Sequence, residues 1–186
     1  MAKFNKKTGK DTSIRIGEVR FSYAAVFQPK KNDDGTPSKY GVCVIIPKED
    51  TETVNLVREA IDAAKQRGKM EKWGGKIPAN VKSCLRDGDI DREDDEAFAG
   101  CYFLNASSRN KPGVKVLEDG VVSDALDEED FYSGCYGAVT LDFFPYESSG
   151  NKGVGAGLNN VIKTRDGDRL SGGRSADEDF ADLGTC

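Results

Sequence analysis

The chain has 186 residues and no histidine. This absence excludes Ser-His-Asp and Cys-His catalysis, histidine general bases and zinc fingers. The five cysteines form no C-x-x-C pair, and four of them fall in or beside apolar runs, which predicts buried, reduced thiols. No apolar run approaches the roughly 18–20 residues of a membrane span, and no apolar stretch follows the basic N-terminus as in a secretory signal. These features predict a cytoplasmic protein.

Basic residues are missing from the last twelve positions, 175–186, where four carboxylates surround Phe180 and Leu183. Such a segment buries too little apolar surface to offset its ordering entropy, so it predicts a disordered interaction tail. Residues 87–96 hold seven acids and one base, and residues 117–130 hold seven acids and no base. Although the formal net charge is −5, the remainder of the chain therefore carries +12. A basic surface for a polyanion is compatible with this segregation of charge.

Alternating apolar residues and turn signals predict a mainly β chain with one long helix. The helix is expected over residues 51–67, with Asp50 as N-cap and Gly68 at the C′ position. Several short strands, one helix and 21 glycines indicate a small β-barrel or sandwich with a helical insertion. The expected strands cover residues 14–27, 39–47, 98–106, 112–117, 134–146 and 153–165.

Aromatic and basic residues interleave along the chain, as for Trp73 between Lys72 and Lys76. Proteins that hold single strands without sequence preference combine cations that follow the phosphates with rings that stack on bases. Most phenylalanines are expected in the core, whereas Tyr and Trp tolerate a wet surface better. Along residues 134–146, period 2 places Tyr136 and Phe144 on the polar face of the strand, which suits a stacking platform.

The acidic cluster Asp87, Asp89 and Asp91 leaves an alternative open, a Mg²⁺-dependent nuclease. Its spacing does not complete an EF-hand, because Arg92 occupies the position that requires glycine. The ordinary interpretation is a solvated acidic loop. The glycines at 153, 155 and 157 lack the Lys-Ser/Thr of a P-loop, so no nucleotide cofactor, and no cofactor or metal of any kind, is expected.

Seven stretches carry a resemblance to a known family: AAVFQPK (24–30), KYGVCVIIPKED (39–50), WGGK (73–76), LRDGD (85–89), GCYFLNASSRNKPGV (100–114), YSGCYGAVTLDFFPY (132–146) and LNNVIKTRDGDRL (158–170). In this order they resemble a family of phage and prophage single-stranded-DNA-binding proteins, long filed as a domain of unknown function. The resemblance implies an oligonucleotide-binding (OB) fold, a five-stranded Greek-key β-barrel akin to the single-stranded-DNA-binding protein of T7-like phages. It also implies a role in phage DNA replication, recombination or repair in the bacterial host cytoplasm.

The resulting prediction is a non-enzymatic protein with a flexible basic arm (1–12), an OB domain (13–172) and an acidic disordered tail (173–186). The expected partners are single-stranded DNA and, through the tail, phage replication or recombination proteins. No membrane partner is expected, and a homo-oligomer is left open. A β-rich virion structural or assembly protein is the second alternative. The predicted DNA-binding residues are Lys30, Lys39, Tyr40, Trp73, Lys76, Arg86, Tyr102, Arg109, Lys111, Tyr136, Phe144 and Lys163, and the predicted tail residues are Asp177, Glu178, Asp179, Phe180 and Asp182.

Overall fold

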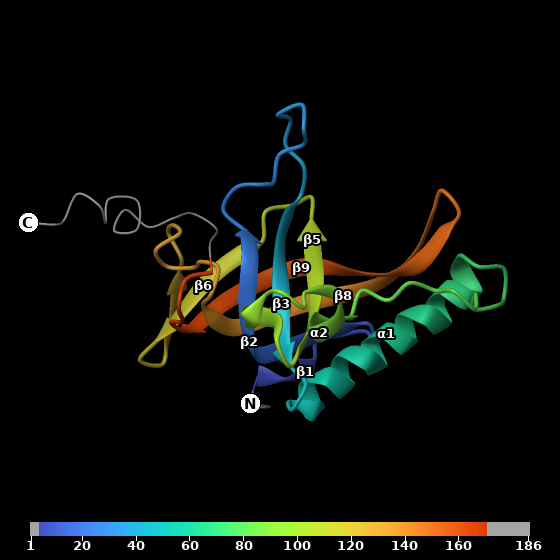
Figure 1. The fold of residues 1–186 in the computed structure, drawn as a ribbon, viewed down its shortest axis with the longest axis horizontal. Helices are drawn as coiled ribbons and strands as arrows, with labels where there is room; N and C mark the ends of the chain where they lie inside the picture. The colour runs from blue at the N-terminus through green and yellow to red at the C-terminus, as the bar shows by residue number, and fades with distance from the viewer. Residues whose placement is uncertain (1–3, 171–186) are drawn as a thin grey trace, which may run out of the picture.

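Nine strands and one long helix form the part of the chain that the computed structural model describes, residues 4–170 (Figure 1). The strands run in the order β4-β5-β3-β2-β8-β9-β6-β7, and β1 pairs with β2. The elements are β1 (Lys6–Lys7), β2 (Ser13–Ala25), β3 (Tyr40–Pro47), α1 (Thr51–Glu71), β4 (Arg86–Asp87), α2 (Gly88–Asp91), η2 (Glu96–Phe98), β5 (Cys101–Ser108), β6 (Gly113–Glu118), β7 (Val121–Asp124), β8 (Tyr136–Ser148) and β9 (Asn151–Arg165).

A closed barrel forms from β2, β3, β5, β9 and β8. Antiparallel ladders join β8 to β9, β2 to β8, β2 to β3, and β3 to β5. The ring closes through a parallel pairing of Ala106 on β5 with Ala156 on β9. The interior is filled by alternate residues such as Ile16, Val44 and Leu141, each at most 1% exposed. This closed barrel confirms the mainly β, OB-type architecture that the sequence predicted.

The outer face of β3 is apolar too, because a second small core lies on it. Cys43 and Ile45 are buried there beneath Phe98 and Phe103, whose rings meet edge to face with centroids 5.1 Å apart. Phe98 belongs to η2, so the acidic segment 88–98 is held against the barrel at this point. The carboxylates of this segment are mostly exposed, as expected of a solvated acidic loop, but its residues Gly88 and Phe98 are buried.

Helix α1 begins where the sequence predicted, because Asp50 accepts a hydrogen bond from the backbone N–H of Thr53 at 3.3 Å. It continues one turn beyond the expected end at Gly68, which lies inside the helix and is buried. A Cβ on Gly68 would lie 2.7 Å from Cβ of Pro145 and 2.7 Å from the ring of Trp73. This glycine is therefore explained by close packing of α1 on β8, and the prediction that it caps the helix is wrong.

Four cysteines within residues 4–170 are free thiols, as expected. Burial raises the pKa of the Cys43 and Cys84 thiols to about 12 and that of Cys135 to about 11. The fourth, Cys101, is half-buried, and burial raises its pKa as well. Desolvation therefore keeps all four thiols in the neutral, weakly nucleophilic form.

The basic arm predicted over residues 1–12 is, from Phe4 on, folded back on the barrel. Lys6 pairs with Arg15 and Lys7 with Ile14 in the short β1–β2 ladder. Asn5 donates to the Thr53 hydroxyl at 2.8 Å and accepts from the backbone N–H of Gly17 at 3.0 Å. These hydrogen bonds correct the expectation of a free arm for residues 4–12. The predicted tail residues 175–186 lie outside the described part of the chain.

Candidate nucleic-acid interface

One row of residues crosses the outer face of the barrel in register. On β8, Tyr136 pairs with Arg165 of β9 on one side and with Arg20 of β2 on the other. The same row continues from Arg20 through the strand pairs of β3, β5 and β4. Directly paired residues of a sheet point to the same face. In order, this transverse row is Arg165, Tyr136, Arg20, Ile45, Phe103 and Arg86.

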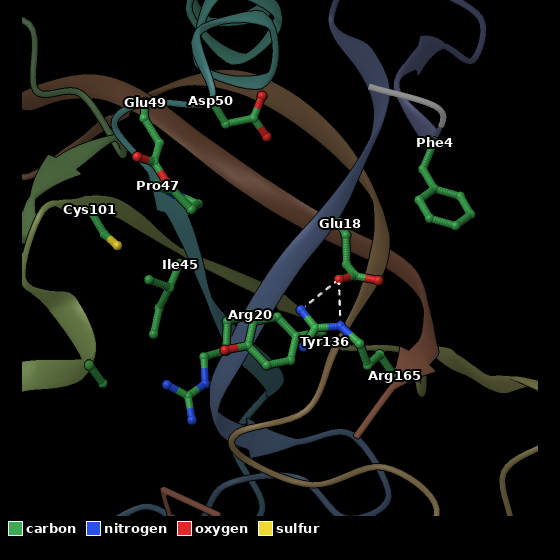
Figure 2. A pocket seen from close by; sticks show the side chains of 11 residues that line it. Phe4, Glu18, Arg20, Ile45, Pro47, Glu49, Asp50, Cys101, Tyr136 and Arg165 are labelled. Atoms are coloured by element: carbon green, nitrogen blue, oxygen red, sulfur yellow. Dashed lines mark hydrogen bonds and ion pairs between the residues drawn. The ribbon is translucent and has the colours of Figure 1, made fainter. Parts of the chain in front are cut away.

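Tyr136 lies between two guanidinium groups in this row (Figure 2). The guanidinium carbon of Arg165 is 3.9 Å from the ring centroid, and that of Arg20 is 5.3 Å away. Arg165 donates two hydrogen bonds to one carboxylate oxygen of Glu18, at 2.9 and 2.8 Å. Arg20 donates to the backbone carbonyls of Gly134 and Asp168, at 3.2 and 2.9 Å. Both cations are therefore oriented before any ligand arrives.

Glu18 holds Arg165 in place without neutralising the whole surface. Burial alone would raise the pKa of this carboxyl, but hydrogen bonds from Arg165 and Thr164 bring it below its usual value. Glu18 is therefore ionised at neutral pH and forms a fixed ion pair with Arg165 at 2.8 Å. Arg20 has no carboxylate partner among the described residues, so its positive charge is available to an anion.

A pocket of about 550 Å³ opens on this face. Arg20, Tyr136 and Arg165 line one side of it, and Ile45 forms part of an apolar floor (Figure 2). The remaining lining residues are Phe4, Glu18, Pro47, Glu49, Asp50, Ala97 and Cys101. Its guanidinium side therefore holds Arg20 and the ion pair of Arg165 with Glu18, together with the Tyr136 ring, whereas Glu49 and Asp50 lie away from it (Figure 2). Such a site can hold a flat apolar group on its floor and an anion at its guanidinium side.

A second exposed ring, Phe144, lies on the long β8–β9 hairpin. Its side chain is 42% exposed, and it pairs with Gly155 of β9. A Cβ on Gly155 would lie 2.7 Å from the ring, so the absence of a side chain there lets the ring lie against β9. Lys10 and Arg67 line a pocket of about 380 Å³ beside Phe144. Phe144 with Lys10 and Arg67 therefore forms a second site that combines an aromatic ring with cations.

The structure separates the predicted binding residues into several groups. Tyr136 and Phe144 share the outer face of β8, as the alternation predicted. Tyr40 is half-buried where β3 begins. The five predicted cations without an ion pair in the described residues are exposed and lie in loops: Lys30 and Lys39 between β2 and β3, Lys76 after α1, and Arg109 and Lys111 between β5 and β6.

Four predicted residues are engaged within the protein. Trp73 is 6% exposed, packs on Gly68, and donates through Nε1 to the carbonyl of Tyr146 at 3.4 Å. Lys163 is also 6% exposed and forms an ion pair with Asp166 at 2.8 Å. These two are corrected to structural residues, because burial denies them contact with a polymer.

The other two are partly accessible but already have partners. Tyr102 is half-buried, with Lys48 and Arg58 within 5.2 and 5.1 Å of its ring centroid. Arg86 forms an ion pair with Asp91 at 3.2 Å and lies over the ring of Phe103. A ligand would have to compete with these contacts.

Four residues that line these two pockets are not among those predicted from the sequence: Arg20, Arg165, Phe4 and Arg67. Arg165 is the last residue of β9, where the strand expected over residues 153–165 also ends. The outward position of Arg20 could not be predicted, because the pairing register shifts between Ile16 and Val19. This shift turns Val19 and Phe21 inward and Arg20 outward. Strict alternation from Ile14 cannot anticipate that shift. The available signal was that Glu18 and Arg20 fall on the positions that strict alternation from Ile14 would place in the core.

The carboxylates proposed for a nuclease are occupied by cations. Lys48 lies 2.7 Å from both Asp87 and Asp89, and Asp91 is paired with Arg86. Lys48 donates hydrogen bonds to Asp87 and Asp89, which raise its pKa above the usual value, and Lys48 in turn lowers the pKa of Asp89. Within residues 4–170, no group of three or more His, Cys, Asp or Glu side chains is arranged to hold a metal ion. The nuclease alternative therefore has no support in this geometry.

A closed five-stranded barrel with rings and guanidinium groups across its outer face defines an OB-type protein. Its outer face has the groups that bind nucleic acid in such proteins. A family model, Enterobacter phage Enc34 ssDNA-binding protein, matches residues 12–185. The chain belongs to this family of phage proteins.

A sequence relative supports that membership, and two solved structures share the fold. "Putative protein p50" of Acyrthosiphon pisum secondary endosymbiont phage 1 is 33% identical over 180 residues, which is 91% of this chain and 93% of the relative. The single-stranded DNA-binding protein from bacteriophage Enc34, solved in complex with ssDNA, matches with a TM-score of 0.75 at 24% identity, over 90% of this chain and 97% of that one. A second solved structure of the single-stranded DNA-binding protein from bacteriophage Enc34 matches with a TM-score of 0.71 at 23% identity. The match covers 95% of this chain and 97% of that one.

No helix within the described residues is long and apolar enough to cross a membrane.

Proposed function

We propose that this protein binds single-stranded DNA without sequence preference, in phage DNA replication, recombination or repair in the bacterial host cytoplasm. The observation that carries the proposal is the Tyr136 ring, with pre-oriented Arg20 and Arg165 beside it, on the outer face of an OB-type barrel. Membership of the Enc34 ssDNA-binding family supports the same ligand.

Chemistry assigns a role to each side of the interface. A base gains about 1–3 kcal/mol by stacking on an aromatic ring whatever its identity, because every base has a π-face. Tyr136 and Phe144 offer such rings, and the guanidinium of Arg20 offers a charge-assisted hydrogen bond to phosphate. The transverse row contains no amide or carboxylate side chain of the kind that recognises base edges, so little base preference is expected.

The distance between the two rings suits a strand of several nucleotides. Tyr136 and Phe144 are eight residues apart on β8, about 26 Å along an extended strand at about 3.3 Å per residue. A path that joins them would cover a site within the range of about 4–16 nucleotides that OB folds occupy. The loop cations Lys30, Lys39 and Lys111 are proposed to hold the phosphates that flank this path.

The acidic tail predicted over 173–186 is proposed to compete for the same face when DNA is absent, and to recruit replication or recombination proteins. A tethered polyanion has a high effective concentration near a basic surface. Truncation after Arg174 is expected to tighten binding at low salt, with a smaller gain at high salt because exposed charges are screened. Unchanged affinity at low salt would contradict this role of the tail.

A titration of labelled single-stranded and duplex oligonucleotides, followed by fluorescence anisotropy at two salt concentrations, tests the proposal. We expect stronger binding to the single strand, and about 1–3 kcal/mol of loss for Tyr136→Ala. Arg20→Gln should weaken binding and reduce the salt slope by about 0.7. The matched control is Lys115→Gln, which removes a cation paired with Asp124 on the β6–β7 hairpin and should change neither quantity.

Equal affinity for both forms of DNA would contradict the proposal. Absence of DNA binding would favour a virion structural or assembly protein instead.

A further inference from the structure

Two strand edges in the described residues remain open and differ in charge. Among residues 4–170, β1, β4 and β7 each pair with one neighbour only. The charged residues of β4 are both paired, Arg86 with Asp91 and Asp87 with Lys48, so this edge carries no free charge of one sign. Among residues 4–170, the strands β1 and β7 each leave one backbone edge without a neighbouring strand. An unpaired edge offers a row of backbone N–H and C=O groups to another strand.

The β7 edge is apolar and surrounded by acidic residues. Val121 is 64% exposed, Val122 is 58% exposed, and Leu126 in the following loop is 82% exposed. Glu118 and Glu128 flank this patch and form no ion pair within residues 4–170. We call the surface formed by Glu118, Val121, Val122, Leu126 and Glu128 the acidic edge. Natural edge strands usually place charged residues, often Lys, where this one has two valines.

The β1 edge has the opposite charge. Lys6 and Lys7 constitute the strand, both are exposed, and Lys10 follows in the turn. Lys6 and Lys10 form no ion pair in the described part of the chain, and Lys7 lies 3.8 Å from the exposed Asp11. We call Lys6, Lys7 and Lys10 the basic edge.

We propose that the acidic edge is a docking surface for the basic edge of a second copy of this chain. The two surfaces complement each other in charge, and each supplies the unpaired strand that the other lacks. Main-chain hydrogen bonds between β7 and β1 of the second copy would provide the contact, as in other cases of strand addition. The charges would select the partner, because two acidic edges or two basic edges repel each other.

The contact does not require DNA, so it is independent of the proposed function. Its consequence for a DNA-binding protein is that neighbouring copies would be joined on one strand, which favours adjacent binding. Because the paired charges are exposed, the contact should weaken as salt approaches the range where the screening length falls to about 3 Å, near 1 M.

Sedimentation velocity of the full-length protein without DNA tests the proposal, at 50 mM and 500 mM salt. We expect association that grows with protein concentration at low salt and about tenfold weaker association at high salt. Lys6→Glu/Lys7→Glu and Glu118→Lys/Glu128→Lys should each weaken low-salt association about tenfold or more. A 1:1 mixture of the two variants should recover association to within about threefold of the wild type, because each altered edge then meets an opposite charge.

The matched control is Lys69→Glu/Lys76→Glu, which makes the same change of charge at exposed positions at and beyond the end of α1. It should associate like the wild type. Unchanged circular dichroism spectra and melting temperatures would show that each variant is folded. A monomer at every concentration in 50 mM salt would overturn the proposal. So would a mixture that associates no better than its two components, since that result would assign the charge effects to something other than this pair of edges.

Discussion

Phe143 and Phe144 are neighbours on β8, and the pleat of the strand places them in opposite environments. Phe143 is 1% exposed in the barrel core, whereas Phe144 is 42% exposed over Gly155. The chemistry of the two side chains is identical, so their difference in role follows from position alone.

Alanine at each of these positions should separate stability from binding. Phe143→Ala is expected to lower the free energy of unfolding by about 3–5 kcal/mol, because it leaves a cavity in the core. Phe144→Ala should cost about 1 kcal/mol of stability and weaken binding to single-stranded DNA by about 1–3 kcal/mol. Urea unfolding and an anisotropy titration measure the two quantities. If Phe144→Ala leaves DNA affinity unchanged, the ring is not a stacking site.

Three thiols with raised pKa values provide a second prediction at this scale. Since burial raises the pKa of Cys43, Cys84 and Cys135 to between about 11 and about 12, these thiols should be almost entirely protonated at pH 8. Labelling with a thiol reagent and peptide mass spectrometry should find them unmodified in the native protein and modified in denaturant. Rapid native labelling of Cys135, which is 0% exposed, would show that the barrel opens more readily than its packing indicates.

Helix α1 packs closely on strand β8 at Gly68. Replacing this glycine with alanine has two opposing effects on stability, one from helix propensity and one from packing. Ala in place of Gly gains about 1 kcal/mol of helix propensity. The added Cβ would meet Pro145 and Trp73 at 2.7 Å, and overpacking of that kind costs about 1–3 kcal/mol. Gly68→Ala should therefore lower the melting temperature, and Lys69→Ala, its exposed neighbour, should leave stability within about 0.5 kcal/mol. A more stable Gly68→Ala would show that the helix can shift away from β8.

Much of the fold could be predicted at the scale of elements, because β2, β3, β8, β9 and α1 carry clear periodicity. The β1, β4 and β7 strands were missed, since two to four residues contain no measurable period. The site was less predictable. The faces of Tyr136 and Phe144 follow from alternation, but the pairing of Arg20 with Tyr136 depends on a register shift in β2. The prediction that Trp73 contacts DNA was wrong because nothing in the sequence near it indicates that Gly68 leaves room for its ring.

At the scale of the molecule, segregated charge reconciles an acidic protein with a polyanion as ligand. The acidic segment 88–98 is packed on β3 and β5, and the acidic edge lies on the β6–β7 hairpin and the loop that follows it. Neither segment includes Tyr136, Arg20 or Arg165, which lie on β8, β2 and β9, although Ala97 of the first segment lines the same pocket. The net charge of −5 is therefore a poor guide to the potential at the proposed interface.

The proposed path of single-stranded DNA follows the outer face of the barrel from Tyr136 to Phe144. Photo-cross-linking with an oligonucleotide that carries 5-iododeoxyuridine, followed by mass spectrometry of the digested complex, tests it most directly. We expect adducts on the peptides that contain Tyr136 and Phe144, and their loss when unlabelled single-stranded DNA competes. Adducts confined to other surfaces, such as the β6–β7 hairpin, would contradict it.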